Sequence, residues 1–392
     1  MKKVVITSAK RTPIGSFNGS LASLSAGQLG SIAIKGVLDE SKISPELIDE
    51  VIMGNVLTAG IGQAPARQAA IFAGLPDKTE CMTINKVCGS GLKAVMLAAQ
   101  AIQTGNAEII IAGGQESMSN APYILDKARN GYRLGNGEII DSLVKDGLWD
   151  VYNNIHMGNC AEACAKEFNF TREELDAFAI NSYKRALDAQ KSGRFKDEII
   201  EIKIKAGREE VIVNSDEEPG KVKFDKIPTL RPVFDKNGVV TAANASSIND
   251  GAAALLVMSE DKAKELGLTP LVEIVEQSSA AKDPMHFTTA PADSINKVLK
   301  KANLKLSDID LFEINEAFAV VSLANNKLLG LDDRSVNVNG GAVALGHPIG
   351  ASGARVLVTL IHEMKKRKSK YGLASLCIGG GEAASLVVKN YE

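Results

Sequence analysis

The sequence has no long hydrophobic run, few aromatic residues and almost no net charge. None of its apolar segments approaches the roughly 20 residues that a membrane-spanning helix needs, so we expect no membrane partner. The net charge of −2 argues against a basic surface for nucleic acid, and an aromatic fraction of 5% with one Trp offers bases little to stack on. What remains is a globular composition, with 45% hydrophobic and 23% charged residues.

Cysteine is also scarce. Five widely spaced cysteines in 392 residues do not make a disulfide framework, and they suit a reducing compartment. Residues 1–8 read as a strand, without the long apolar stretch of a signal peptide or the Arg/Ser-rich composition of a transit peptide. We therefore expect a cytoplasmic protein, or one of the mitochondrial matrix if a presequence was removed.

Short β-rich segments alternate with helical patterns along most of the chain. Most of these segments are apolar throughout rather than alternating, which is typical of strands buried on both faces. The pattern predicts an α/β protein with layered sheets and helices. The expected strands lie at 4–6, 51–53, 108–112, 255–258, 272–275, 309–314, 336–338, 374–378 and 385–388.

An internal repeat relates the two ends of the chain. Ser90-Gly91, at the start of an expected helix, recurs as Ser352-Gly353 at an offset of 262, and Ile48-Asp49 recurs as Ile309-Asp310 at an offset of 261. Chance similarity between amphipathic segments is the alternative interpretation. The near-constant offset favours two copies of one fold. We predict one half at 1–118, completed by about 250–268, and the other at 269–392, with the chemistry between them.

The stretch 119–249 differs from both halves in being richer in polar residues, and we interpret it as an inserted loop domain. It contains one clear helix, with a capping box of Thr171 and Glu174 and an end at Gly193. The expected buried stripe of that helix is Leu175, Phe178, Ala179, Ser182 and Ala186. Further on, five basic residues indicate either a rim for a phosphorylated ligand or an ordinary solvated surface: Lys221, Lys223, Lys226, Arg231 and Lys236.

Cys88 stands in Asn85-Lys86-Val87-Cys88-Gly89-Ser90-Gly91, where the apolar segment 81–84 gives way to a helical one. A thiol on such a strand-to-helix elbow is held out of the core, and the N–H groups of the next helix turn point toward it. We therefore expect a lowered thiol pKa and a place where an anion can form, and we interpret Cys88 as a nucleophile. Three other cysteines fit the alternative of a small inert side chain, and their spacing predicts no metal site: Cys81, Cys160 and Cys164.

His347 lies in Gly346-His347-Pro348-Ile349-Gly350, and it is one of four histidines in the chain. A histidine that only packs in the core is rarely flanked by proline and glycine in this way. We interpret it as the general base that takes the proton of the Cys88 thiol. We expect His362 to lie on the surface and assign no role to His286.

Two more residues fit the same chemistry. Cys377 follows the apolar segment 373–376 and precedes Gly379-Gly380-Gly381, and a thiol with a pKa near 8.5 can both give and take a proton. Asn315, in Asn315-Glu316-Ala317-Phe318, follows a strand end, and its amide could hold a water that donates to an oxyanion. Two thiols and an imidazole beside glycines indicate covalent chemistry on an acyl group.

Four of these motifs together resemble signatures of the thiolase family, in the family's order: Asn85 to Gly91, Asn315 to Phe318, Gly346 to Gly353 and Cys377 to Gly381. The likeness extends from Ser8 to the last strand. Within the family, the segments His156 to Glu162 and Asn244 to Ser246 are most similar to the tetrameric acetoacetyl-CoA thiolases of bacteria and mitochondria. The resemblance implies two duplicated halves in a layered α/β/α/β/α sandwich, and a dimer or a dimer of dimers.

The resemblance also implies an activity and a role for each matching residue. The activity is acetyl-CoA C-acetyltransferase, the reversible condensation of two acetyl-CoA to acetoacetyl-CoA and CoA by a ping-pong mechanism. Cys88 would be acylated, His347 would activate it, and Cys377 would move the α-proton. One oxyanion hole would come from His347 with the water on Asn315, the other from the N–H groups of Cys88 and Gly379. Ser246 would bond the pantetheine of CoA, in a tunnel lined by Leu148, His156, Met157, Phe234, Ala243 and Phe318. No metal or redox cofactor is implied.

The chain departs from the family pattern at some positions. Where bacterial members carry His-Pro-Arg, it has Glu218-Pro219-Gly220, so Lys221 or Lys223 is expected to replace the arginine near the CoA nucleotide. The mitochondrial tyrosine that helps to hold potassium near Pro219 is not matched, which leaves potassium activation open. Glu382 replaces the usual Gln or Gly after the glycine triplet.

The preference for branched substrates is also open, because Phe287 matches the branched-substrate subgroup whereas Thr288 replaces its proline. Two rival functions remain at this stage. One is a long-chain 3-ketoacyl-CoA thiolase of the same fold, and the other is an acyl-CoA binder without a reactive thiol. A decarboxylating ketoacyl synthase is disfavoured, because that chemistry pairs the nucleophile with His or Asn rather than with a second cysteine.

Overall fold

The computed structural model describes residues 2–206 and 209–391. The first half of the fold is built from β1 (Val4–Arg11), β3 (Glu50–Gly54), β4 (Glu80–Ile84), β5 (Ile109–Ser117) and β12 (Asn249–Ser259). β3 lies between β4 and β5 and is parallel to both, whereas β5, β12 and β1 follow in antiparallel order. The helices of this half are α1 (Ala26–Ser41), α2 (Pro65–Phe72), α3 (Ser90–Thr104) and α6 (Glu260–Glu265).

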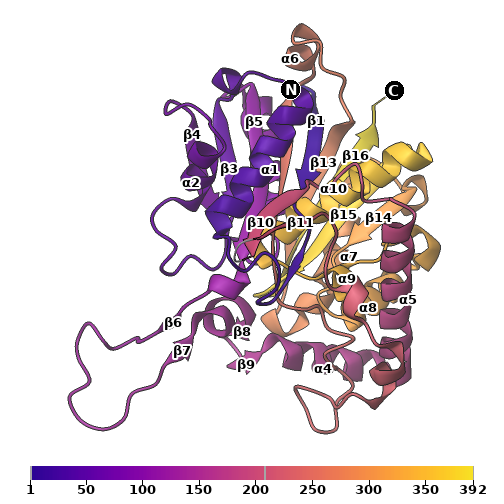
Figure 1. The fold of residues 1–392 in the computed structure, drawn as a ribbon. Coiled ribbons are helices and arrows are strands. Elements are labelled where there is room, and N and C mark those ends of the chain that lie inside the picture. The colour runs from indigo at the N-terminus through magenta and orange to yellow at the C-terminus, as the bar shows by residue number, and fades with distance from the viewer. Residues whose placement is uncertain (1, 207–208, 392) are drawn as a thin grey trace.

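The second half repeats this strand pairing, as the sequence repeat predicted. β14 (Leu311–Ile314) is parallel to β15 (Tyr371–Ile378), and β15, β16 (Glu382–Asn390) and β13 (Val272–Ala281) follow in antiparallel order. Its helices are α7 (Ala290–Ala302), α8 (Ala319–Leu329), α9 (Ala342–Leu345) and α10 (Ile349–Arg367). Figure 1 shows the indigo and purple elements of the first half, β1 to β5, beside the orange-to-yellow second half.

One predicted strand is wrong. Residues 336–338 form no strand, and Val336 makes a single parallel bridge to Phe312. Asn337 has a left-handed backbone (φ 46°) that ends the extended conformation, and its side chain bonds the backbone N–H and C=O of Ile314 instead. This place corresponds to β4 of the first half, because both lie next to a parallel strand and precede a helix of the middle layer.

The helices form layers around the strands, as the fold class predicted. α3 and α10 pack against each other and against strands of both halves, and a continuous apolar core surrounds them. α1 and α2 cover the other face of the first half, and α7 covers that of the second. The two halves are joined edge to edge by β1 and β13, so the described strands of the two halves make one ten-stranded mixed sheet with β2 (Gly15–Ser16) off its path.

The stretch 119–249 contains β6 (Tyr123–Ile124), β7 (Ile140–Asp141), β8 (Trp149–Asp150), β9 (Ile155–His156), α4 (Met157–Phe168), α5 (Arg172–Lys191), β10 (Ile202–Ala206) and β11 (Glu209–Val213). A π-helix spans Leu143–Leu148. α5 is the predicted helix, and both hydrogen bonds of its capping box are present. Its predicted stripe is buried except for Phe178, which is half-buried. Short 3-10 helices lie at Pro45–Leu47, Met118–Asn120, Pro219–Lys221, Phe224–Thr229, Pro284–Thr289, Leu306–Asp308 and Asp333–Ser335.

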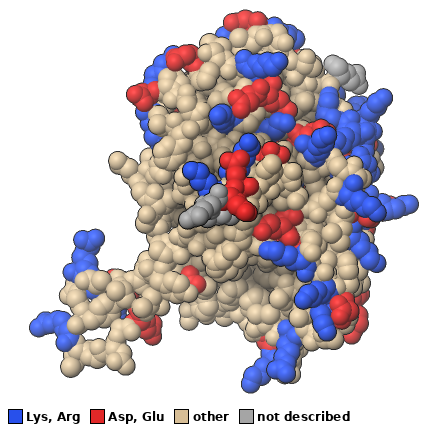
Figure 2. Space-filling view, viewed as in Figure 1, with Lys and Arg blue, Asp and Glu red and all other residues tan. Residues whose placement is uncertain are grey.

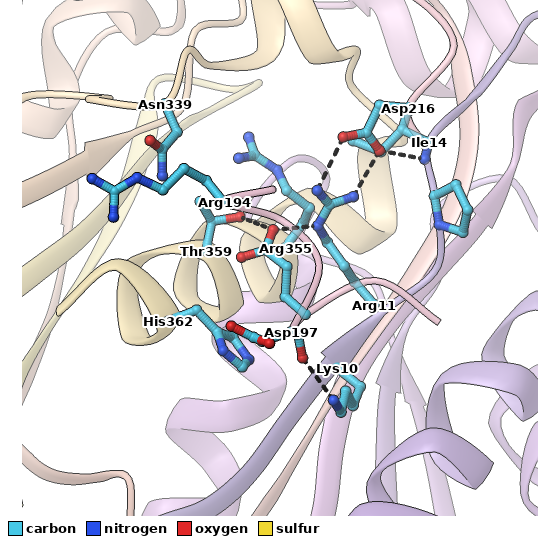
Figure 3. A network of polar contacts seen from close by, with 12 residues as sticks. Lys10, Arg11, Ile14, Arg194, Asp197, Asp216, Asn339, Arg355, Thr359 and His362 are labelled. Atoms are coloured by element: carbon cyan, nitrogen blue, oxygen red, sulfur yellow. Dashed lines mark hydrogen bonds and ion pairs between the residues drawn. The ribbon is translucent and has the colours of Figure 1, made fainter. Parts of the chain in front are cut away.

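A buried ion network ties this stretch to the rest of the fold (Figure 3). Arg11 of β1 donates from Nε to Glu198 (2.6 Å) and from both terminal nitrogens to Asp216 (2.7 and 3.0 Å). Thr359 of α10 also donates to Glu198 (2.9 Å). Burial alone would lower the pKa of Arg11, but the charges of the two carboxylates outweigh it and raise that pKa. Two acids of the stretch 119–249 are thereby fixed to the middle of the sheet.

His362 does not lie on the surface, contrary to the sequence prediction. Its ring is buried, and Nε2 lies 2.8 Å from the carbonyl oxygen of Ala9. The reason is that α10 belongs to the middle layer and is buried from its start to Met364; its exposed end begins at Lys365. Within residues 2–206 and 209–391, no helix has both the length and the hydropathy to cross a bilayer.

Candidate active site

A cavity of about 290 Å³ opens where the two halves meet the stretch 119–249. Cys88 and Met118 come from the first half, and Phe318, His347 and Gly379 from the second. The stretch 119–249 supplies most of the remaining wall, and Phe287, Ala317 and Ile349 of the second half complete it. The full lining is Cys88, Met118, Gly147, Leu148, His156, Met157, Val233, Phe234, Ala245, Ser246, Ser247, Ile248, Phe287, Ala317, Phe318, His347, Ile349 and Gly379.

The turn between β4 and α3 places Cys88 at this cavity. Asn85 caps the turn by accepting the N–H of Val87 (2.9 Å), and Ser90 Oγ accepts the N–H of Lys86 (2.8 Å) while donating to the carbonyl of Val87 (2.7 Å). Val87 is thereby held in the left-handed region (φ 46°), a costly conformation for a β-branched residue. α3 begins at Ser90, so Cys88 lies just before the N-terminus of a helix, as predicted.

The electrostatic prediction for Cys88 is wrong in sign. Burial raises the pKa of the Cys88 thiol to about 11, although the N–H groups of Gly379 and of Cys88 itself lower it by hydrogen bonding to the sulfur. The loss of hydration outweighs the two N–H groups because most of the cavity lining around Cys88 is apolar. The resting thiol is therefore protonated and needs a base.

His347 follows α9, and its backbone is fixed by Asn249, whose Oδ1 accepts the His347 N–H (2.9 Å). Gly346 is required here: it has φ 102°, and a Cβ would lie 2.3 Å from the Asn249 side chain. Burial, followed by the charge of Arg355, lowers the pKa of His347 to about 3. The imidazole is therefore neutral at physiological pH.

The contacts of His347 define which ring nitrogen carries the proton. Nδ1 lies 2.5 Å from Ser352 Oγ, and that hydroxyl donates to the carbonyl of Pro348 (2.9 Å). Because the hydroxyl proton is used on Pro348, Ser352 accepts from Nδ1–H. Nε2 is then unprotonated and faces the Asn315 Nδ2 amide at 3.5 Å. A free lone pair at Nε2 is what a general base requires.

Cys377 lies on β15, and Asn315 directly follows the neighbouring strand β14. The Asn315 N–H donates to the carbonyl of Ser375 (3.0 Å), and its Oδ1 is buried and makes no hydrogen bond within the described residues. Cys377 is fully buried, and burial followed by the charge of Cys88 raises the pKa of its thiol well above the ordinary value. The two thiols therefore lie close enough to interact, although Cys377 lies behind the cavity wall rather than in it.

Most residues predicted to contact CoA line this cavity: Leu148, His156, Met157, Phe234, Phe318 and Ser246. Aromatic contacts hold the wall together, with His156 stacked on Phe234 (4.7 Å between centroids) and Phe234 edge-on to Phe318 (6.3 Å). An adjoining groove of about 470 Å³ shares Phe234 and Ser246 with the cavity and extends to Lys221. Ala243, which was also predicted to contact CoA, lines neither the cavity nor the groove. In this turn, Ala242 and Ala245 line the groove instead.

Sequence reasoning missed the residues that hold the catalytic loops. Ser352 appeared in a motif, but nothing in the sequence indicated its bond to His347. Asn249 lies 98 residues from His347 along the chain. Glu316 accepts from Ser182 Oγ (2.7 Å), Asn337 Nδ2 (2.9 Å) and the Val343 N–H (3.2 Å), and so joins the Asn315 turn to the segment before His347. Such long-range bonds leave no spacing signal.

Comparisons with known proteins identify the family of this chain. Residues 4–261 match the family described as thiolase, N-terminal domain, and residues 268–390 match thiolase, C-terminal domain. The acetyl-CoA acetyltransferase of Schizosaccharomyces pombe is 54% identical over 99% of this chain and 98% of its own length. That of Cupriavidus necator is 54% identical over 99% and 100%. A mitochondrial acetyl-CoA acetyltransferase of Bos taurus is 53% identical over 99% and 92%.

Two solved structures have the same fold. The crystal structure of the Bacillus anthracis acetyl-CoA acetyltransferase is similar with a TM-score of 0.97 at 45% identity, over 100% of this chain and 99% of the other. A thiolase from Ascaris suum, solved in complex with coenzyme A, is similar with a TM-score of 0.94 at 45% identity, over 99% and 100%.

Proposed function

This chain belongs to the thiolase family, and from that premise we propose how its residues carry out acetyl-CoA acetyltransferase chemistry. The activity is the reversible condensation of two acetyl-CoA to acetoacetyl-CoA and CoA. The observation that carries the assignment is the meeting of Cys88, His347 and Gly379 at one cavity, with Cys377 interacting with Cys88 from behind the wall.

In the first half-reaction, the sulfur of Cys88 attacks the carbonyl carbon of acetyl-CoA as its proton passes to His347 Nε2. The negative charge on the carbonyl oxygen is stabilised by the N–H groups of Cys88 and Gly379, which already point toward the sulfur. The bond to the CoA sulfur then breaks, and the departing thiolate takes the proton of Cys377. The products are acetylated Cys88, free CoA and a Cys377 thiolate paired with a protonated His347.

In the second half-reaction, the Cys377 thiolate removes the α-proton of a second acetyl-CoA. Protonated His347 and a water on the free Oδ1 of Asn315 stabilise the enolate oxygen. The carbanion attacks the acetyl group on Cys88, and the Cys88 sulfur leaves and recovers its proton from His347. Every proton is returned to the group that gave it, so the enzyme ends the cycle in its starting state. The same steps in reverse order cleave acetoacetyl-CoA, and neither direction uses a metal or redox cofactor. Potassium activation has no step in it.

The shape of the cavity supports a thioester that enters lengthwise. The acetyl end would lie at Cys88, the pantetheine arm along Leu148, Met157 and Ser246, and the nucleotide toward Lys221 in the adjoining groove. Lys221 is within 3.8 Å of Glu217, so part of its charge is already compensated. The nucleotide would therefore gain less from Lys221 than from an unpaired arginine.

Self-association is part of the proposal. The segment between β6 and β7 stands clear of the body and carries basic side chains, as Figures 1 and 2 show. It also exposes the large apolar side chains Leu125, Leu134 and Ile139, next to the exposed Tyr123 of β6. Apolar side chains on a projecting arm favour contact with a second copy, which supports a dimer or a dimer of dimers. All five cysteines are unpaired, which supports a reducing compartment, the cytoplasm or the mitochondrial matrix.

The test is mass spectrometry of the intact protein after exposure to acetyl-CoA, with peptide mapping. Wild-type protein should carry one acetyl group on Cys88, and Cys88→Ala none. Cys377→Ala should still be acetylated on Cys88 by a reactive acetyl thioester. Its condensation reaction should be at least about 1,000-fold slower than that of wild type, which corresponds to a barrier increase of about 4 kcal/mol. Cys81→Ala, on β4 away from the cavity, is the control and should behave as wild type. Acetylation elsewhere, or normal condensation by Cys377→Ala, would contradict the assignment.

A further inference from the structure

The oxyanion site at Cys88 is assembled from two separate turns. One donor is the N–H of Cys88, in the turn between β4 and α3. The other is the N–H of Gly379, in the turn between β15 and β16. No single element fixes the distance between these two N–H groups, so contacts across the two turns must do so.

The two turns pack closely, because a side chain at each turn lies against a glycine of the other. A Cβ on Gly89 would lie 2.3 Å from Cδ1 of Ile378, and a Cβ on Gly379 would lie 3.5 Å from Cγ1 of Val87. Val87 is itself in the strained left-handed region, which persists only where surrounding contacts hold it. The Cys88 turn is therefore supported from outside as well as by its own hydrogen bonds.

One ion pair crosses between these turns. The ammonium group of Lys86, two residues before Cys88, bonds the carboxylate of Glu382, three residues after Gly379. The side chains of Lys86 and Glu382 are 24% and 38% exposed. The ion pair is therefore in contact with solvent, and dissolved salt can screen it. Burial, followed by the charge of Lys86, lowers the pKa of Lys93 of α3, and the charge of Glu382 opposes this shift.

We propose that Lys86 and Glu382 are positioning residues that clasp the two turns and set the spacing of the Cys88 and Gly379 N–H groups. Neither residue lines the cavity, so the clasp acts on the stabilisation of the oxyanion and not on CoA binding. Errors in placing catalytic donors lower the rate steeply, because their hydrogen bonds must point at the atom where charge develops. This inference rests on the proposed function, since it concerns the same reaction.

Glu382→Gln tests the clasp by removing the charge at constant size. We expect kcat to fall about three- to tenfold with KM within twofold, and Cys88 to remain acetylated. The control is Glu276→Gln, which removes the comparably exposed pair of Glu276 with Lys301 between β13 and α7 and should leave both constants unchanged. In wild type, kcat should fall as NaCl rises from about 0.05 to 0.5 M, and Glu382→Gln should lose that dependence.

The double variant Lys86→Glu/Glu382→Lys restores the pair with its charges exchanged. We expect it to recover kcat to within about twofold of wild type, which a merely structural role of Glu382 would not predict. The clasp is refuted if Glu382→Gln matches Glu276→Gln in kcat, or if the exchange does not restore the rate. A wild-type protein that is not acetylated at Cys88 would instead refute the proposed function, so the two failures are distinct.

Discussion

Substitution of Ser352 tests which ring nitrogen of His347 carries the proton, because Ser352 contacts His347 but no reacting atom. Its hydroxyl accepts Nδ1–H of His347 at 2.5 Å and donates to Pro348, which leaves Nε2 free to act as the base. Ser352→Ala removes that acceptor. The loop itself should persist, because the Pro348 carbonyl still accepts the N–H groups of Ala351 (3.0 Å) and Ser352 (2.9 Å).

The magnitude follows from what the imidazole can then do. If the proton stays on Nδ1, it is a buried donor without a partner, at a cost of about 1–3 kcal/mol. If it moves to Nε2, the lone pair is lost, and Nε2–H faces the Nδ2 donor of Asn315. The first state keeps the active base but is destabilised, and the second state lacks it, so the population of the active base falls. We therefore expect acetyl transfer to Cys88 to slow by about 5- to 150-fold.

A single-turnover experiment at saturating acetyl-CoA measures this step directly. The rate of Cys88 acetylation should fall in Ser352→Ala, while the apparent affinity for acetyl-CoA changes less than twofold. Ser294→Ala is the matched control, a fully buried serine of α7 whose Oγ donates to Ser278 O (3.3 Å). If Ser352→Ala acetylates within twofold of wild type, or no more slowly than Ser294→Ala, the tautomer assignment is wrong.

Three further predictions concern stability and assembly. Arg11→Met should leave Glu198 and Asp216 buried without a cation, at a cost of about 3–5 kcal/mol, and lower Tm by about 4–6 °C in calorimetry; an unchanged Tm would contradict it. Burial raises the pKa of Glu116 from 4.5 to about 7, so the folded protein holds this proton where the unfolded chain has lost it. The contribution of Glu116 to stability is therefore greatest below about pH 4.5 and is lost as the pH rises through about 7. Urea unfolding should show that the destabilisation by Glu116→Gln is about 2.5 kcal/mol larger at pH 5 than at pH 8; a pH-independent difference would refute the shift. Leu134→Ser/Ile139→Ser on the projecting arm should yield a smaller assembly in light scattering, whereas an unchanged mass would remove the arm from the interface.

Local sequence patterns predicted what depends on neighbouring residues. The capping box at Thr171 and the strand-to-helix elbow at Cys88 are such features, because each needs only a few consecutive residues. The repeat predicted the strand pairing of the second half, since the same offsets persisted through strands and helices. The motifs also placed His347, Gly379 and Ser246 at one cavity, although those positions came from the resemblance to a family rather than from spacing alone.

Tertiary context decided the rest. His362 looked like a surface residue because basic residues follow it, but the helix that carries it lies in the middle layer. The Cys88 pKa was expected to fall because the helix N-terminus and nearby N–H groups are local, whereas burial depends on the whole cavity. The partners of His347 are set by Asn249 and Ser352, and only the folded chain brings Asn249 to the loop.

The repeat also explains why one half of this duplicated fold carries the nucleophile. Gly350 is the counterpart of Cys88 at the offset of 262, and Asn55 follows β3 as Asn315 follows β14. At the Gly350 elbow, the carboxylate of Glu116 accepts N–H groups from Val56 (3.0 Å), Leu57 (3.1 Å) and Gly350 (2.8 Å). A Cβ at Gly350 would lie 2.7 Å from that carboxylate, so no cysteine fits there. The N–H group that could polarise a thiol is used by Glu116 to fix the loop carrying His347. The elbow at Cys88 can therefore carry the nucleophile, whereas the equivalent elbow at Gly350 is occupied by the Glu116 contacts that hold the loop of the base, His347.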